Sequence, residues 1–121
     1  MFDGPEPIYQ QIAEQLRRQV LDGTLAPGDQ VMSTTQYATT YRINPATAAK
    51  AFSLLVDEGV IEKRRGLGMY VTEGATAQLR ARRRTEFLNE RIDELLDEAR
   101  ALGIDDTELI NHIQTRSKEA T

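Results

Sequence analysis

The feature that most constrains this chain is a pair of helix signals separated by a break of only two residues, 42–43. Ser33, with Gln36 three residues later, has the spacing of a capping box and predicts the start of a short helix. After the break, Asn44 precedes Pro45, and an N-cap residue followed by proline predicts the start of a second helix. Two helices joined by so tight a turn indicate a helix-turn-helix unit.

A further helix is predicted before this unit, and the second helix of the unit has a defined end. Ahead of the unit, apolar residues recur every four positions, which is typical of an amphipathic helix: Ile8, Ile12, Leu16 and Val20. The helix that begins at Pro45 is expected to end near Glu58, because Gly59 follows it. Its expected inner face consists of Ala48, Phe52, Leu55 and Val56.

The hydrophobic period changes after Gly59. Short apolar runs at residues 60–61 and 69–71 flank a basic segment that contains glycine, and this order predicts a β-hairpin. Helix, short helix, turn, helix and hairpin is the order of a winged helix-turn-helix domain, whose exposed helix can enter the DNA major groove. We therefore expect a mainly α-helical protein with a small β-hairpin, in which residues 1–73 form a DNA-binding domain.

The C-terminal part has the pattern of paired helices. Its apolar positions are separated alternately by four and three residues, a pattern that resembles a coiled-coil seam. A shorter helix is expected after Gly103. Because two helices alone cannot cover this apolar surface on both sides, residues 76–116 are predicted to form a dimerisation segment, followed by a frayed tail at residues 117–121. The expected dimer interface contains Leu88, Ile92, Leu95, Leu96, Ala99, Leu102, Leu109 and Ile113.

Composition excludes several classes of protein. The 121 residues suffice for one domain with an appendage, and the absence of cysteine removes disulfides, cysteine–zinc sites and thiol nucleophiles. A single histidine, His112, cannot form a multi-histidine metal site, and no nucleophile–base pair or phosphate-binding loop stands out. The sequence thus predicts a cytoplasmic protein that is not an enzyme, with no cofactor, no metal and no membrane span.

The net charge of −4 argues at first sight against a nucleic-acid partner, but the distribution of charge does not. No acidic residue lies between Thr34 and Ala51, a stretch that contains Arg42, Lys50 and several threonines. The expected hairpin adds a basic run at residues 63–65. A locally positive surface is therefore expected, with modest DNA affinity that depends strongly on salt.

Five segments in order and spacing resemble the GntR family of bacterial transcription regulators. They are residues 7–12 (PIYQQI), 23–31 (GTLAPGDQV), 44–52 (NPATAAKAF), 55–61 (LVDEGVI) and 64–71 (RRGLGMYV). The Asn-Pro helix start and the short C-terminal part are similar to the YtrA subfamily. The predicted homodimer would present two recognition helices and read a palindromic operator, and we expect the protein to be a repressor. The resemblance to the YtrA subfamily implies an ABC-type transporter operon among its targets. It indicates no particular small-molecule effector.

The predicted fold and the resemblance together select the residues expected to contact DNA. They are Ser33, Thr34 and Thr35 before the turn, Asn44, Ala46, Thr47 and Lys50 on the recognition helix, and Arg64, Arg65, Gly66 and Gly68 in the wing. Thr47 and Lys50 are expected to contact phosphates or base edges, and Ala46 a thymine methyl group. The family usually has Pro-Ser-x-Arg at residues 32–35, where this chain has Met-Ser-Thr-Thr, so the contact of that arginine is lost or weakened.

Other charged groups allow simpler interpretations. The cluster of Arg80, Arg82, Arg83 and Arg84 could contact phosphates, but pairing with acids such as Glu86 and Glu90 is favoured. The acids Asp93, Glu94, Asp97 and Glu98 indicate a solvated helix face rather than a metal site. A second class of function stays open, namely a winged-helix module for protein interaction or dimerisation without an operator. Such a module would not need an acid-free recognition helix.

Overall fold

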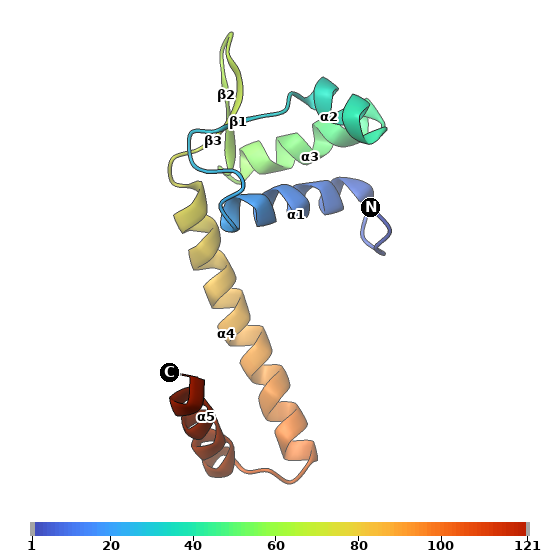
Figure 1. The fold of residues 1–121 in the computed structure, drawn as a ribbon. Helices are drawn as coiled ribbons and strands as arrows, with labels where there is room; N and C mark the ends of the chain where they lie inside the picture. Colours follow the sequence, from blue (N-terminus) through green and yellow to red (C-terminus); the bar gives the residue numbers. More distant parts are fainter. Residues whose placement is uncertain (1, 121) are drawn as a thin grey trace. The chain divides into compact units, whose positions relative to one another are not determined.

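The structure is a computed structural model that describes residues 2–120. The chain forms two compact units, of which the first ends at Ala81 and the second begins at Arg82. The described elements are, in order, α1 (Ile8–Leu21), β1 (Gln30–Val31), α2 (Thr34–Tyr41), α3 (Pro45–Asp57), β2 (Ile61–Arg64), β3 (Gly68–Val71), α4 (Ala75–Ala101) and α5 (Asp106–Ala120) (Figure 1). The expected mainly helical fold with a small antiparallel sheet is confirmed.

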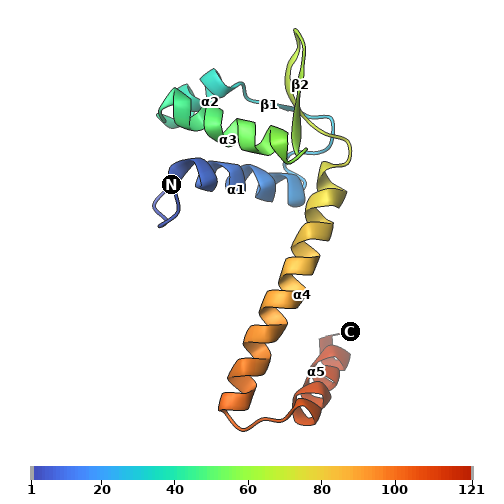
Figure 2. The ribbon, with the colours of Figure 1, turned by 180° about the vertical axis from the view of Figure 1, so that it is seen from behind.

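The first unit is built around α3. Helices α1 and α3 lie side by side, and α2 packs beside the end of α3 at which that helix begins (Figures 1 and 2). Ile12 of α1 and Leu55 of α3 are fully buried in the shared core, together with Ala48 and Ala51, whose small side chains let the helices approach closely. These contacts cover one face of α3 and fix its position in the unit.

One polar contact joins α2 to α1 inside this packing. The Tyr37 ring lies edge-on to Phe52 with centroids 5.5 Å apart, and the Tyr37 hydroxyl donates a hydrogen bond to Gln15 Oε1 at 3.1 Å. Burial raises the pKa of Tyr37 to about 12. The phenol therefore keeps its proton, and remains a hydrogen-bond donor to α1, even in alkaline solution where an exposed tyrosine would ionise.

The sheet has three strands, one more than the expected hairpin. β3 lies between β1 and β2 and is antiparallel to both. In the β1–β3 pair, Gln30 is opposite Tyr70 and Val31 is opposite Met69. A strand of two residues is too short to show an alternating pattern, so the sequence gives no signal for β1.

The start of α4 belongs to the core of the first unit. Ala75 and Leu79 are buried in the same cluster as Val60 and Val71. Because of this burial, the compact unit continues to Ala81, past the boundary at residue 73 expected for the DNA-binding domain. The boundary at residue 73 of the functional DNA-binding domain stays a prediction.

The second unit has almost no core of its own. Among residues 82–120, Ala99 is the only buried side chain, and α4 and α5 do not pack closely against each other. Helix α5 runs to Ala120, so the tail expected to fray from residue 117 is helical up to that residue, and Thr121 lies outside the described residues. None of the described helices combines the length and the apolar character that crossing a membrane requires.

The expected inner faces of the helices are correct except at two positions. Ile8 is 46% exposed because it lies in the first turn of α1, at the edge of the packed region. Val56 is 39% exposed, and Ala51 takes the expected place of Val56 in the core. The other six apolar residues assigned to α1 and α3 are buried: Ile12, Leu16, Val20, Ala48, Phe52 and Leu55.

Replacing Leu79 by alanine should lower the free energy of unfolding of the first unit by about 2–5 kcal/mol, because a fully buried side chain leaves a cavity. Leu67→Ala is the matched control, since Leu67 is 64% exposed and its truncation should change little. Urea unfolding followed by tyrosine fluorescence measures this unit, because Tyr9, Tyr37, Tyr41 and Tyr70 all lie in it. A loss for Leu79→Ala as small as that of the control would show that α4 is not part of the core.

Candidate nucleic-acid interface

A complete capping box forms the start of α2. The Ser33 hydroxyl accepts a hydrogen bond from the Gln36 N–H at 3.0 Å, and Gln36 Oε1 accepts one from the Ser33 N–H at 3.2 Å. Ser33 therefore has a structural role at this helix start, whereas Thr35 is exposed and Thr34 is half-buried. The helix ends at Tyr41, and its C-cap residue Arg42 has the left-handed backbone conformation (φ 54°) and an exposed side chain.

Helix α3 presents an outer face of small side chains and one cation. The Asn44 side chain accepts a hydrogen bond from the Ala46 N–H at 2.7 Å and so fixes the first turn. Residues Ala46, Ala49, Lys50 and Ser53 are exposed, and Thr47 is half-buried. The outer face carries no carboxylate before Asp57, at the last residue of the helix. Ser53, exposed one turn after Lys50, is a candidate contact that the sequence pattern did not single out.

The Lys50 ammonium has an aromatic partner on another helix. Its Nζ lies 4.0 Å from the centroid of the Tyr9 ring, which comes from the first turn of α1. The Tyr9 hydroxyl in turn accepts a hydrogen bond from Gln10 Nε2 at 3.2 Å. A cation over an aromatic face is attracted by the ring quadrupole and keeps its full charge.

The wing, residues 61–71, is held in one shape by contacts to the carbonyl oxygen of Leu67. This oxygen accepts hydrogen bonds from Gln30 Nε2 at 3.1 Å and from the Tyr70 hydroxyl at 3.2 Å. Gly68 has φ +116°, and a Cβ atom there would lie 2.8 Å from Gln30 Nε2. Gln30, on the strand that the sequence pattern missed, is thus a structural part of the wing.

The wing cations differ in their surroundings. The Arg64 guanidinium carbon lies 4.3 Å from the centroid of the Tyr70 ring, and Arg64 Nη2 is 3.2 Å from Glu62 Oε1. Arg65 is exposed, at the turn between the strands, and has no carboxylate within ion-pair distance among residues 2–120. Arg65 is therefore more available to a phosphate than Arg64, and the exposed Lys63 is similar to Arg65 in this respect.

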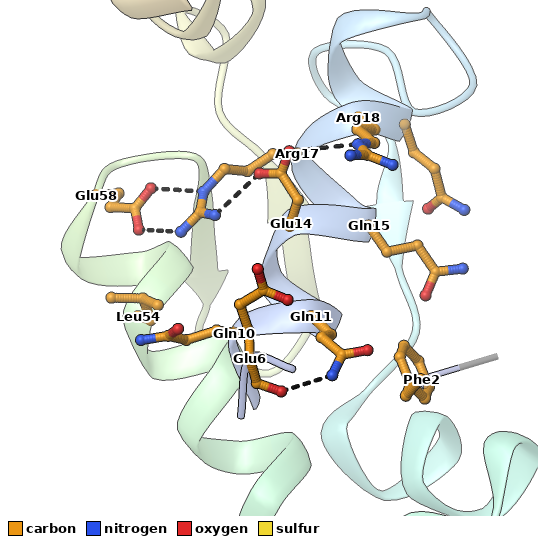
Figure 3. A pocket seen from close by; sticks show the side chains of 11 residues that line it. Phe2, Glu6, Gln10, Gln11, Glu14, Gln15, Arg17, Arg18, Leu54 and Glu58 are labelled. Carbon is orange, nitrogen blue, oxygen red and sulfur yellow. Dashed lines mark hydrogen bonds and ion pairs between the residues drawn. The ribbon is translucent and has the colours of Figure 1, made fainter. Parts of the chain in front are cut away.

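The arginines of α1 are paired with acids instead. Arg17 binds Glu58 through two hydrogen bonds, Nε to Oε1 at 2.9 Å and Nη2 to Oε2 at 2.6 Å, and these bonds raise the pKa of Arg17. Arg18 pairs with Glu14 at 3.3 Å. These pairs line a hollow formed by α1, the N-terminal segment and the end of α3 (Figure 3). The hollow has charges of both signs, unlike the outer face of α3.

In the second unit, most of the residues expected at a dimer interface are exposed in the single chain. The exposed fractions are 55% for Leu88, 41% for Ile92, 39% for Leu95, 72% for Leu102 and 48% for Ile113. Leu96 and Leu109 are half-buried, and Ala99 is buried. Phe87 and Ile110, which were not assigned to the interface, are also more than half exposed. The apolar surface is therefore wider than the heptad pattern indicated.

The other charged residues of the second half lie on the surface. Arg80, Arg82 and Arg84 are exposed and Arg83 is half-buried, and their role in phosphate contact or ion pairing stays a prediction. The acids of the predicted solvated face are exposed, and two of them pair with arginines one turn away, Glu94 with Arg91 and Asp97 with Arg100. His112 is exposed on α5.

A helix-turn-helix with an attached wing defines the class of winged helix-turn-helix DNA-binding proteins, and the outer face of α3, with no acid before Asp57, fits this class. Comparison with known families agrees with this class: the family model described as bacterial regulatory proteins, gntR family, matches residues 8–71. The chain belongs to the GntR family, and it is a DNA-binding transcriptional regulator rather than an enzyme.

Individual relatives support this assignment over most of the chain. The HTH-type transcriptional repressor YtrA of Bacillus subtilis (strain 168) is 36% identical over 99 residues, which are 82% of this chain and 75% of that protein. A solved GntR family transcriptional regulator from Listeria monocytogenes has a TM-score of 0.70 and 28% identity, over 94% of this chain and 98% of that one. A transcriptional regulator from Oenococcus oeni has a TM-score of 0.80 at 22% identity, over 95% and 94% of the two chains, and supports the fold.

Gly68→Ala should destabilise the first unit by about 1–3 kcal/mol, chiefly because the backbone is held at a φ that side chains avoid, and also because the new Cβ displaces the Gln30 amide from its hydrogen bond to the Leu67 carbonyl. Gly66→Ala is the matched control, since Gly66 also has a positive φ, +77°, but no atom lies within 4 Å of its Cβ position. Urea unfolding followed by tyrosine fluorescence compares the two variants. Equal losses would mean that the contact between Gln30 and the wing contributes nothing to stability.

Proposed function

We propose that this regulator binds a palindromic operator as a homodimer and represses transcription. The observation that carries the proposal is the outer face of α3, which exposes Lys50 among small side chains and has no acid before Asp57. A surface of this kind allows close approach to base edges in the major groove without repelling the phosphates. The name of the Bacillus subtilis relative, a transcriptional repressor, supports repression as the direction of control.

Each part of the surface has a proposed role. On α3, Thr47 and Lys50 contact base edges or phosphates, Ala46 contacts a thymine methyl group, and Asn44 fixes the helix start. In the wing, Arg64 and Arg65 contact phosphates, Gly66 lets the backbone approach the adjacent groove, and Gly68 makes room for the Gln30 amide that shapes the wing tip. At the start of α2, Thr34 and Thr35 replace the stronger contact that an arginine would make, while Ser33 caps the helix.

The partner proposed for the exposed apolar face of the second unit is a second copy of this chain. That face belongs to a unit with almost no core, so a single chain leaves it in water. Burial against a copy stabilises the dimer by about 25 cal/mol per Å² of apolar area. A two-fold dimer presents two recognition helices and thus reads a palindrome with half-sites about one helical turn apart.

The proposed DNA affinity follows from the same surface. With few unpaired cations on the DNA-facing elements, each half-site is bound weakly, and the DNA-binding domains of both copies are needed for an operator to be occupied.

Similarity to the YtrA subfamily supports an ABC-type transporter operon among the targets, with regulation taking place in the cytoplasm. The sites that the protein binds can be found by selection from random-sequence DNA, which also tests the palindrome directly.

Lys50→Ala and Arg65→Ala should each weaken binding to the selected operator at least several-fold, because each removes one cation from the DNA-facing surface. If the contact is with a phosphate, the slope of log K against log salt should also fall by about two units, because the dimer loses one contact in each half-site. Lys118→Ala, in α5, is the control with the same loss of charge. Fluorescence anisotropy at several salt concentrations measures both quantities. Binding that does not depend on salt would instead favour a protein partner.

Leu95→Asp should convert the dimer to monomers, because the partner chain would have to bury a charge in its apolar face. Leu67→Asp makes the same substitution in the wing, outside that face, and should leave the dimer intact. Sedimentation equilibrium gives the molecular mass of both variants. A Leu95→Asp protein that remains dimeric would refute this assignment of the interface.

A further inference from the structure

We propose that Tyr9 is a specificity-determining positioning residue, which holds the Lys50 ammonium where it reads a base edge. This inference rests on the proposed function, because it assumes that the outer face of α3 meets DNA. It adds a residue from α1, outside the helix-turn-helix and the wing, to the DNA-reading machinery.

The geometry joins a fixed group to a flexible one. Tyr9 is half-buried and packs against the core, so its ring has a defined position. Lys50 is exposed, and its Nζ lies 4.0 Å from the centre of that ring. Among residues 2–120, the Tyr9 ring is the group that the Lys50 ammonium contacts, with no carboxylate in ion-pair range.

An aromatic ring suits this task better than a carboxylate would. A carboxylate beside Lys50 would cancel its charge and be repelled by the DNA backbone, whereas a ring leaves the charge intact. The ring face also takes up few of the three N–H donors of the ammonium, so they remain available to acceptors such as guanine O6 and N7. The lysine is thus held in place and still able to bind.

Positioning affects discrimination more than overall affinity. A free lysine side chain can move between a base edge and a neighbouring phosphate, and it loses rotamer freedom when it is ordered on DNA. A lysine already held by a ring reaches one acceptor reproducibly. Loss of the ring should therefore reduce preference for the correct base pair, while the number of charges that the protein brings to DNA stays the same.

The experiment compares Tyr9→Leu, Tyr9→Phe and Lys50→Met in the full-length protein. The probes are a labelled duplex with the selected operator, the set of its single-base-pair variants, and an unrelated duplex of equal length. Tyr9→Leu should reduce discrimination at one base pair of each half-site by about two- to fivefold, with an unchanged salt slope. Tyr9→Phe keeps the ring and should retain the discrimination of the natural protein.

Lys50→Met provides the test of mechanism. In the Lys50→Met background, Tyr9→Leu should have no further effect on discrimination, because no ammonium is left to position. Without DNA, the Lys50 ε-methylene protons should show an upfield ring-current shift in the NMR spectrum of the natural protein, and this shift should disappear in Tyr9→Leu. That measurement also reveals whether the variant is folded.

Three outcomes are decisive. If Tyr9→Leu discriminates as well as the natural protein, or loses the same amount with and without Lys50, Tyr9 is not a positioning residue. If Tyr9→Phe loses as much as Tyr9→Leu, the hydroxyl rather than the ring is responsible, which also overturns the inference. If the natural protein prefers no selected duplex over the unrelated one, the proposed function itself fails, and the assignment of Tyr9 to DNA reading fails with it.

Discussion

Burial of the inner face of α3 is the interaction on which the rest of the first unit depends. Ala48 and Ala51 have small side chains that let the neighbouring helices approach closely, and Phe52 and Leu55 are buried in the same core, Phe52 against Tyr37 of α2. The sheet and the start of α4 close the same core, so elements from most of the unit fix a single helix. A helix fixed on one side can present its other side to a ligand in a constant geometry, which sequence-specific DNA binding requires.

The cations that we propose to face DNA and the cations that support the fold have different partners. Arg17 and Arg18 of α1 are paired with the carboxylates of Glu58 and Glu14. Lys50 instead lies on a tyrosine ring, as Arg64 does, although Arg64 also contacts Glu62. The net charge of −4 therefore says little about partners, because most acids lie outside the recognition surface.

The sequence predicts well those features that depend on neighbouring residues. Ser33 and Asn44 mark helix starts because an N-cap acts within three residues, and both caps are present in the structure. Contacts between distant residues leave no such pattern. The pairing of Gln30 with the Leu67 carbonyl, the contact of Tyr9 with Lys50 and the burial of Leu79 in the first unit could not be predicted, because each depends on how separate elements pack. The helical end of α5 was missed because a polar composition allows an exposed helix as well as a frayed tail.

The left-handed backbone of Arg42 has a consequence for how this protein can vary. Glycine adopts that conformation without a steric penalty, whereas a residue with a side chain gives up about 1–2 kcal/mol there. Arginine at this position is thus less stable than glycine would be, but it places a positive charge in the turn between α2 and α3. Replacing Arg42 with glycine would therefore make the turn more stable and less positively charged, without altering the core.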